Sequence, residues 1–213
     1  MSAGQSELRV PLWKKPSVWL RKLYDFVLSW ANTPYGTIAL AILAFAESSF
    51  FPVPPDVLLI ALALGKPKRA FFYALVCSIF SVLGGMFGYF IGAFLWETVK
   101  DFFIPFIFSQ DAFDHVGRLY QDNAGLAIFS AAFTPIPYKV FTIAAGVWHD
   151  YVSLYELVLF SAIGRPMRFF LVASLLFFFG PPVKRFIEKY FDLLALVFTV
   201  LLVGGFVILK KLL

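Results

Sequence analysis

Uncharged runs along the chain predict helices that cross a membrane. Residues 70–96 carry no charged side chain and exceed the roughly 20 apolar residues that a spanning helix needs. Residues 157–179 have the same spanning length, although Arg165 and Arg168 lie near their centre. The uncharged run 193–209 is shorter but sufficient. The pattern therefore predicts three transmembrane helices.

Two further apolar stretches, 37–64 and 124–148, are interrupted near their middle by proline. Each uninterrupted piece covers only about half of a ~30 Å hydrocarbon core at ~1.5 Å per residue. Proline donates no backbone hydrogen bond and biases the residue before it away from helical geometry, so each stretch is expected to turn back at mid-depth. The pattern predicts two re-entrant helical hairpins, with a kinked spanning helix as the alternative for each. The prolines at the hairpin tips are Pro52, Pro54, Pro55, Pro135 and Pro137.

The two interruptions share one pattern, Pro-x-Pro-x followed by a charged residue. That residue is Asp56 in the first copy and Lys139 in the second. Each hairpin then ends at a glycine, Gly65 or Gly146, and each precedes a predicted transmembrane helix with glycine near its middle. This shared order indicates an internal duplication.

Loop charges assign the two copies to opposite faces of the membrane, because short cytoplasmic loops are rich in Lys and Arg. The segments before and after the first hairpin are basic, as is the loop at 184–189, whereas 97–122 is interpreted as an outer loop with five acids against two bases. The first hairpin is therefore expected to enter from the cytoplasm and the second from the other side. Hairpins opposed in this way form an inverted repeat, in which discontinuous helices build a transport site at the midplane.

The N-terminal residues 1–34 are polar at first and amphipathic afterwards. From residue 17 onward apolar residues recur at helical spacing, which predicts a helix on the membrane surface or packed on the rest of the protein. A membrane domain at 35–190 and a C-terminal transmembrane helix at 191–213 follow. The expected fold class is an all-α integral membrane protein, an inverted repeat of two opposed re-entrant helical hairpins that each precede a transmembrane helix.

Composition agrees with a membrane location and argues against an ordinary soluble domain, a disulfide and a nucleic-acid partner. The chain is 61% hydrophobic and 15% charged, with a mean hydropathy of +0.82, against about half apolar and a quarter charged in soluble domains. The single Cys77 excludes an intramolecular disulfide. The net charge of +5 comes from bases that flank apolar segments, so no nucleic-acid partner is expected. The expected location is the bacterial inner membrane, multi-pass, with a cytoplasmic N-terminus.

Five charged residues fall at hairpin tips or in mid-helix. A charge at the bilayer centre costs about 2.5–3.5 kcal/mol on insertion scales, so these side chains are expected to meet one another or water. Three bases against two acids leave one positive charge, which an anion such as a lipid phosphate would neutralise. The alternative is a purely structural network of charge pairs. The bases, expected to bind substrate, are Lys139, Arg165 and Arg168, and the acids are Glu47 and Asp56.

The two acids are expected either to couple transport to protons or to pair with the bases. Asp56 lies in the first turn of a half-helix, where the helix dipole favours the anion. Glu47 lies at the C-terminal end of its own half-helix and meets the unfavourable end of the dipole. Glu47 is therefore the expected carrier of any proton coupling.

A stripe of glycines lies along residues 70–96. Small residues at this spacing permit close backbone approach between membrane helices, so the stripe is expected to seat a hairpin. No catalytic or phosphate-loop motif accompanies it, and the sequence predicts neither an enzyme nor a cofactor nor a metal site. The stripe comprises Gly84, Gly85, Gly88 and Gly92.

Three motifs in order resemble the DedA superfamily, also described as VTT-domain or SNARE-associated Golgi proteins, and most closely its YqaA-like branch. They are Phe-Ala-Glu-Ser-Ser-Phe-Phe-Pro-Val-Pro-Pro-Asp at 45–56, Gly-Gly-Met-Phe-Gly-Tyr-Phe-Ile-Gly at 84–92, and Phe-Thr-Pro-Ile-Pro-Tyr-Lys-Val-Phe-Thr-Ile-Ala-Ala-Gly at 133–146. The resemblance covers about residues 35–180. It implies two opposed re-entrant hairpins and the movement of undecaprenyl phosphate or phospholipids across the inner membrane. Many members carry a further arginine near the third motif, which Arg165 and Arg168 would replace here.

The sequence thus predicts a lipid translocator of flippase or scramblase type for a phosphate-headed lipid. Its expected partners are membrane lipids and, in a homo-oligomer, further copies of the chain. Two alternatives remain open. The first is a membrane scaffold or assembly protein whose charges only pair with one another, and the second is a proton-coupled ion or small-solute antiporter that uses Glu47 and Asp56.

Overall fold

The computed structural model describes residues 29–30, 33–106, 110–180 and 182 of the 213-residue chain. Within these ranges the chain forms helices joined by short turns and contains no β-strand. The all-helical prediction is therefore confirmed for the described residues. The predicted C-terminal helix, and the predicted N-terminal helix apart from residues 29–30, lie outside the described ranges.

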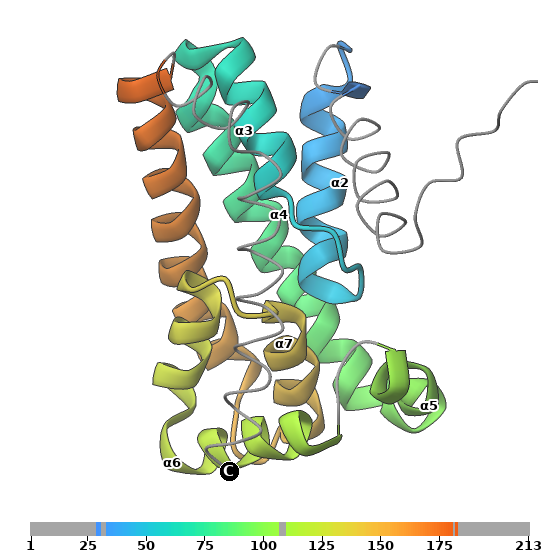
Figure 1. Ribbon diagram of the computed structural model, residues 1–213. Helices are drawn as coiled ribbons and strands as arrows, with labels where there is room; N and C mark the ends of the chain where they lie inside the picture. The colour runs from blue at the N-terminus through green and yellow to red at the C-terminus, as the bar shows by residue number, and fades with distance from the viewer. Residues whose placement is uncertain (1–28, 31–32, 107–109, 181, 183–213) are drawn as a thin grey trace, which may run out of the picture.

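Two helices are long and apolar enough to cross a membrane by length and composition, Pro67–Asp101 and Leu154–Gly180. The first is formed by α4 (Ala70–Phe90), which continues through a π-helical turn (Ile91–Leu95) into α5 (Trp96–Phe106). In Figure 1 α4 runs through the middle of the molecule between α2 and the orange helix Leu154–Gly180. These two helices form the scaffold on which the shorter helices pack.

The first proline-containing stretch forms two helices with a tight turn between them. Helix α2 (Gly36–Ser49) ends where the N–H groups of Phe50 and Phe51 both donate to the carbonyl of Ala46. Three prolines then exclude a continuous helix, because they donate no backbone hydrogen bond. Helix α3 (Asp56–Gly65) begins directly after Pro55. We call α2, this turn and α3 hairpin one.

The second proline-containing stretch follows the same order. Helix α6 (Gln110–Phe133) is broken at Asn123, which has φ −162° and ψ 88°, and its side chain accepts a hydrogen bond of 3.0 Å from the N–H of Leu126. A new helical segment therefore begins after Asn123 and runs to Phe133. The turn at 134–137 leads to α7 (Tyr138–Val147). We call the segment 124–133, this turn and α7 hairpin two.

The interpretation of residues 97–122 as a loop is wrong for the described residues. Residues 97–106 belong to α5 and residues 110–122 to the first part of α6. Aromatic stacking explains the helical structure, since the ring of Phe113 lies 4.4 Å from that of Trp96 and 4.7 Å from that of Trp148. The buried stack gives an acidic segment an apolar face that its charge pattern does not reveal.

The glycines of α4 and of the π-helical turn that follows it lie where the two hairpins pack. A Cβ atom on Gly84 would collide with the backbone of Phe45 in hairpin one, and a Cβ on Gly92 would collide with the backbone of Ile143 in hairpin two. Gly85 and Gly88 face the side chains of Tyr138 and Thr142 of α7. The stripe therefore brings both hairpins against a single face of α4.

Candidate functional site

The turns of the two hairpins meet near the middle of the molecule, where they point in opposite directions (Figure 1). Lys139 Nζ donates to the carbonyl of Phe51 over 3.2 Å, and Thr142 Oγ1 donates to the carbonyl of Ser48 over 2.9 Å. The first contact joins α7 to the turn after α2, and the second joins α7 to the end of α2. Residues about 90 positions apart in the sequence are thus brought into one polar site.

An inner ion pair lies on the α4 side of this site. Arg165 Nη2 lies 2.8 Å from Glu47 Oε2, and the two side chains are only 3% and 12% exposed. Arg165 also donates to the hydroxyls of Ser48 and Ser81, and these two hydroxyls lie 2.6 Å apart. The pair therefore links the helix Leu154–Gly180 to α2 and α4.

Aromatic rings cover the guanidinium of Arg165. Its Cζ atom lies 4.7 Å from the ring centre of Tyr138 and 4.8 Å from that of Phe169, both within the range of cation–π attraction. The hydroxyl of Tyr138 is hydrogen-bonded to that of Ser161. Arg165 is thus held by an acid, two hydroxyls and two rings, an environment that suits a structural anchor.

An outer ion pair lies one helical turn further along the same helix. Arg168 Nη2 and Nε donate to the two carboxylate oxygens of Asp56 over 2.9 and 3.3 Å, and Nη1 donates to the carbonyl of Thr134 over 2.7 Å. The side chains of Arg168 and Asp56 are 17% and 19% exposed. Arg168 therefore bridges both hairpins at a more open position than the inner pair.

Lys139 is the base of the site that has no acidic partner within 4 Å among the described residues. It is 7% exposed, and the carbonyl of Phe51 is its hydrogen-bond acceptor in the described part of the chain. We define the charge cluster as Glu47, Asp56, Lys139, Arg165 and Arg168. Because each arginine has its own carboxylate, the excess positive charge of this cluster falls on Lys139.

The first turns of α3 and α7 also differ in charge. Asp56 occupies the first turn of α3, where an acid compensates the positive end of the helix dipole. Helix α7 has no acid in its first turn and carries Lys139 there instead. The start of α7 therefore combines a helix N-terminus with a base that has no acidic partner among the described residues, an arrangement that suits an anion. Within the described residues no group of three or more His, Cys, Asp or Glu could hold a metal ion.

The structure thus brings together the five charged residues named from the sequence and places the hairpin prolines in the two turns beside them. Sequence reasoning missed the polar residues that connect the charges. A hydroxyl beside apolar residues was the available signal, since a buried hydroxyl needs a hydrogen-bond partner. These residues are Ser48, Ser81, Thr142 and Tyr138.

Comparisons with known proteins give two relatives that are described as uncharacterized. An uncharacterized protein of Haemophilus influenzae is 34% identical over 189 residues, which cover 89% of this chain and 97% of that protein. A Histophilus somni protein, described as an uncharacterized HI0703 homolog, is 31% identical over 167 residues, which cover 78% of this chain and 84% of that protein. No protein-family model matches the chain, and no solved structure matches it.

Proposed function

We propose that this chain, which belongs to the same family as these Haemophilus and Histophilus proteins, is a membrane lipid translocator. The proposal rests on the chain's own site, because both relatives are uncharacterized. The lipid it moves carries a phosphate head group. One observation carries the proposal, namely that Lys139 is buried between two hairpin turns without an acidic partner among the described residues. A buried uncompensated charge is costly, and a phosphate would neutralise it.

The proposed membrane arrangement follows from the lengths of the helices. The 14 residues of α2 and the 10 residues of α3 and α7 are too few to cross a bilayer. We therefore propose that both hairpins are re-entrant and enter from opposite faces as an inverted repeat, in the inner membrane of a bacterium, with the N-terminus in the cytoplasm. The motif resemblance to the DedA superfamily supports the same arrangement.

In the proposed mechanism the three bases have different roles. The phosphate binds first at Lys139 and the start of α7. Arg168 then exchanges its outer contact with Asp56 for the phosphate, since this pair is the more exposed of the two. While the lipid is bound, Arg165 keeps its contact with Glu47 and holds the site together. The hydrocarbon tail remains in apolar surroundings throughout.

Proton coupling is assigned to Glu47. Protonation of its carboxylate would remove the charge that Arg165 Nη2 contacts at 2.8 Å and would loosen hairpin one from the helix Leu154–Gly180. The Glu47→Gln variant imitates this protonated state. Lipid exchange by this variant is therefore expected to lose its pH dependence, and an unchanged pH profile would exclude Glu47 as the proton carrier.

Lipid exchange between leaflets tests the proposed function. Purified protein is reconstituted in liposomes that contain a fluorescent phosphate-headed lipid, and a membrane-impermeant quencher reports the fraction that has crossed. Wild-type protein should speed the exchange, and Lys139→Gln should abolish the gain. Lys100→Gln is the matched control, because Lys100 is an exposed base of α5 that pairs with Glu97 outside the charge cluster. Exchange at the protein-free rate with wild-type protein would refute translocation.

A membrane scaffold is the second candidate function. The observation that favours it is the pairing of both arginines with acids, since a purely structural network needs no ligand. A scaffold would leave lipid exchange at the protein-free rate in wild type and variants alike. The same liposome measurement therefore separates the two functions.

A further inference from the structure

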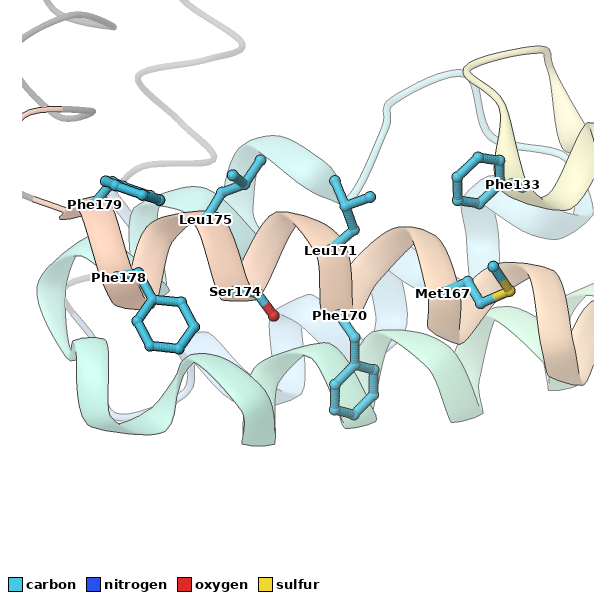
Figure 2. A pocket seen from close by; sticks show the side chains of 8 residues that line it. All are labelled: Phe133, Met167, Phe170, Leu171, Ser174, Leu175, Phe178 and Phe179. Carbon is cyan, nitrogen blue, oxygen red and sulfur yellow. The ribbon is translucent and has the colours of Figure 1, made fainter.

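An apolar groove runs along one face of the helix Leu154–Gly180 and has a volume of about 470 Å³. Figure 2 shows Phe178 and Phe179 at one end of the groove and Met167 at the other, close to Phe133 of α6. The lining is apolar except for Ser174, so the groove suits a hydrocarbon ligand.

The end of the groove at Met167 adjoins the charge cluster. Met167 immediately precedes Arg168, and Phe133 immediately precedes Thr134, whose carbonyl accepts a hydrogen bond from Arg168. Arg168 belongs to the more exposed of the two ion pairs. An apolar groove that ends beside the partly exposed guanidinium of Arg168 is complementary to an amphiphile with an anionic head.

The length of the groove fits one leaflet of a bilayer. Met167 is the middle residue of the helix, and the 12 steps from it to Phe179 correspond to roughly 18 Å at ~1.5 Å per residue. Half of a ~30 Å hydrocarbon core is about 15 Å. The groove therefore extends from the depth of the charge cluster to one end of the spanning helix.

We propose that this groove binds one hydrocarbon chain of a phosphate-headed lipid whose head group contacts Arg168. The inference rests on the proposed lipid translocation and identifies the surface that holds the tail while the head is at the charge cluster. A lipid bound here differs from the surrounding bilayer lipid, because the neighbouring positive charge selects its head group. Selection by head group is therefore the property to measure.

Photolabelling of the full chain in liposomes provides the measurement. The probe is an alkyl phosphate with a diazirine at the end of its chain, and the comparison probe carries the same chain on a trimethylammonium head. Peptide mass spectrometry locates the adducts. The phosphate probe should label residues 167–179 more strongly than the exposed face of α4, and the cationic probe should show no such preference. Equal labelling by both probes would overturn the proposal.

Two tryptophan variants provide a matched pair. Leu175 lines the groove and is 49% exposed, whereas Leu83 lies on the outer face of α4 and is 44% exposed. Leu175→Trp should lower groove labelling by the phosphate probe about tenfold, the change that ~1.4 kcal/mol produces, and Leu83→Trp should leave it unchanged. Equal effects of the two variants would mean that the groove holds only bulk lipid.

Lipid exchange in the same liposomes separates this proposal from the proposed function. Head-group-selective labelling without lipid exchange would support the groove as a binding site and refute translocation. Lipid exchange without selective labelling would support translocation and overturn the groove as the tail site.

Discussion

The two hairpins resemble each other in sequence, but among the described residues only hairpin one is attached to the rest of the protein by ion pairs. Hairpin one carries two acids, and each is paired with an arginine of the helix Leu154–Gly180. Four of the ten residues of α3 are buried. Hairpin two carries a base, and nine of the ten residues of α7 are buried against α4 and its neighbours.

This difference assigns separate roles to the hairpins. Both hairpins pack closely against α4, but only hairpin one adds ion pairs to this packing among the described residues. Because packing and hydrogen bonds position α7, Lys139 is not needed for an ion pair and stays available to an anion. The excess charge therefore lies on the hairpin that has no ion pair of its own among the described residues.

Removing the inner ion pair should have the largest effect on stability. The side chain of Glu47 is only 12% exposed, and Arg165→Ala would remove its counter-charge. Breaking a buried pair in this way costs about 3–5 kcal/mol. Unfolding of the purified protein by a denaturing detergent measures the loss. Lys100→Ala breaks the exposed pair with Glu97 and should leave the unfolding midpoint unchanged. Equal midpoints for the two variants would show that ion pairing does not hold hairpin one.

The glycines at the ends of the two hairpins, Gly65 and Gly146, offer a second test with a smaller expected effect. A Cβ atom at Gly146 would lie 2.7 Å from the backbone nitrogen of Ala93 and would also collide with the carbonyl of Tyr89, whereas a Cβ at Gly65 would meet no atom within 4 Å. Gly146→Ala should therefore lose about 1–3 kcal/mol of unfolding free energy, the usual cost of overpacking. Gly65→Ala should lose none of this packing energy. Similar losses in both would contradict the distinction between the hairpins.

These two glycines also show how far the sequence predicts the fold. Helix periods, proline breaks and run lengths placed the short helices and the five charges, because each of these signals is local. Gly65 and Gly146 occupy equivalent positions in the pattern, yet only Gly146 touches another backbone. That contact depends on how far α7 approaches α4, which no local pattern encodes.

The sequence likewise did not predict which partner each of the three bases contacts. The three bases looked equivalent as phosphate ligands, but their partners depend on the rotation of each helix. Arg165 faces Glu47, two serines and two aromatic rings, whereas Lys139 faces a backbone carbonyl. The aromatic face of the helical residues 97–106 and 110–122 was hidden in the same way, because its partner Trp148 lies far along the chain.

The outer pair should contribute less to stability than the inner pair. Asp56 and Arg168 are 19% and 17% exposed, so partial solvation reduces what their pairing contributes. Asp56→Asn keeps a hydrogen-bond acceptor for Arg168 and should lose about 1 kcal/mol of unfolding free energy. The same detergent titration measures it, with Asp150→Asn at an exposed position as the control. A loss as large as that of Arg165→Ala would mean that both pairs anchor hairpin one equally.

The smallest effect on stability is expected at Lys139, and its sign should be reversed. Lys139→Met removes a buried charge that has no acid partner among the described residues, while it keeps an unbranched side chain in the same space. The unfolding free energy should therefore stay unchanged or rise, because no counter-ion is left unpaired. Lys139→Arg keeps the charge and should retain part of the lipid exchange, whereas Lys139→Met should lose it. A marked loss of stability in Lys139→Met would show that this lysine anchors hairpin two as the arginines anchor hairpin one.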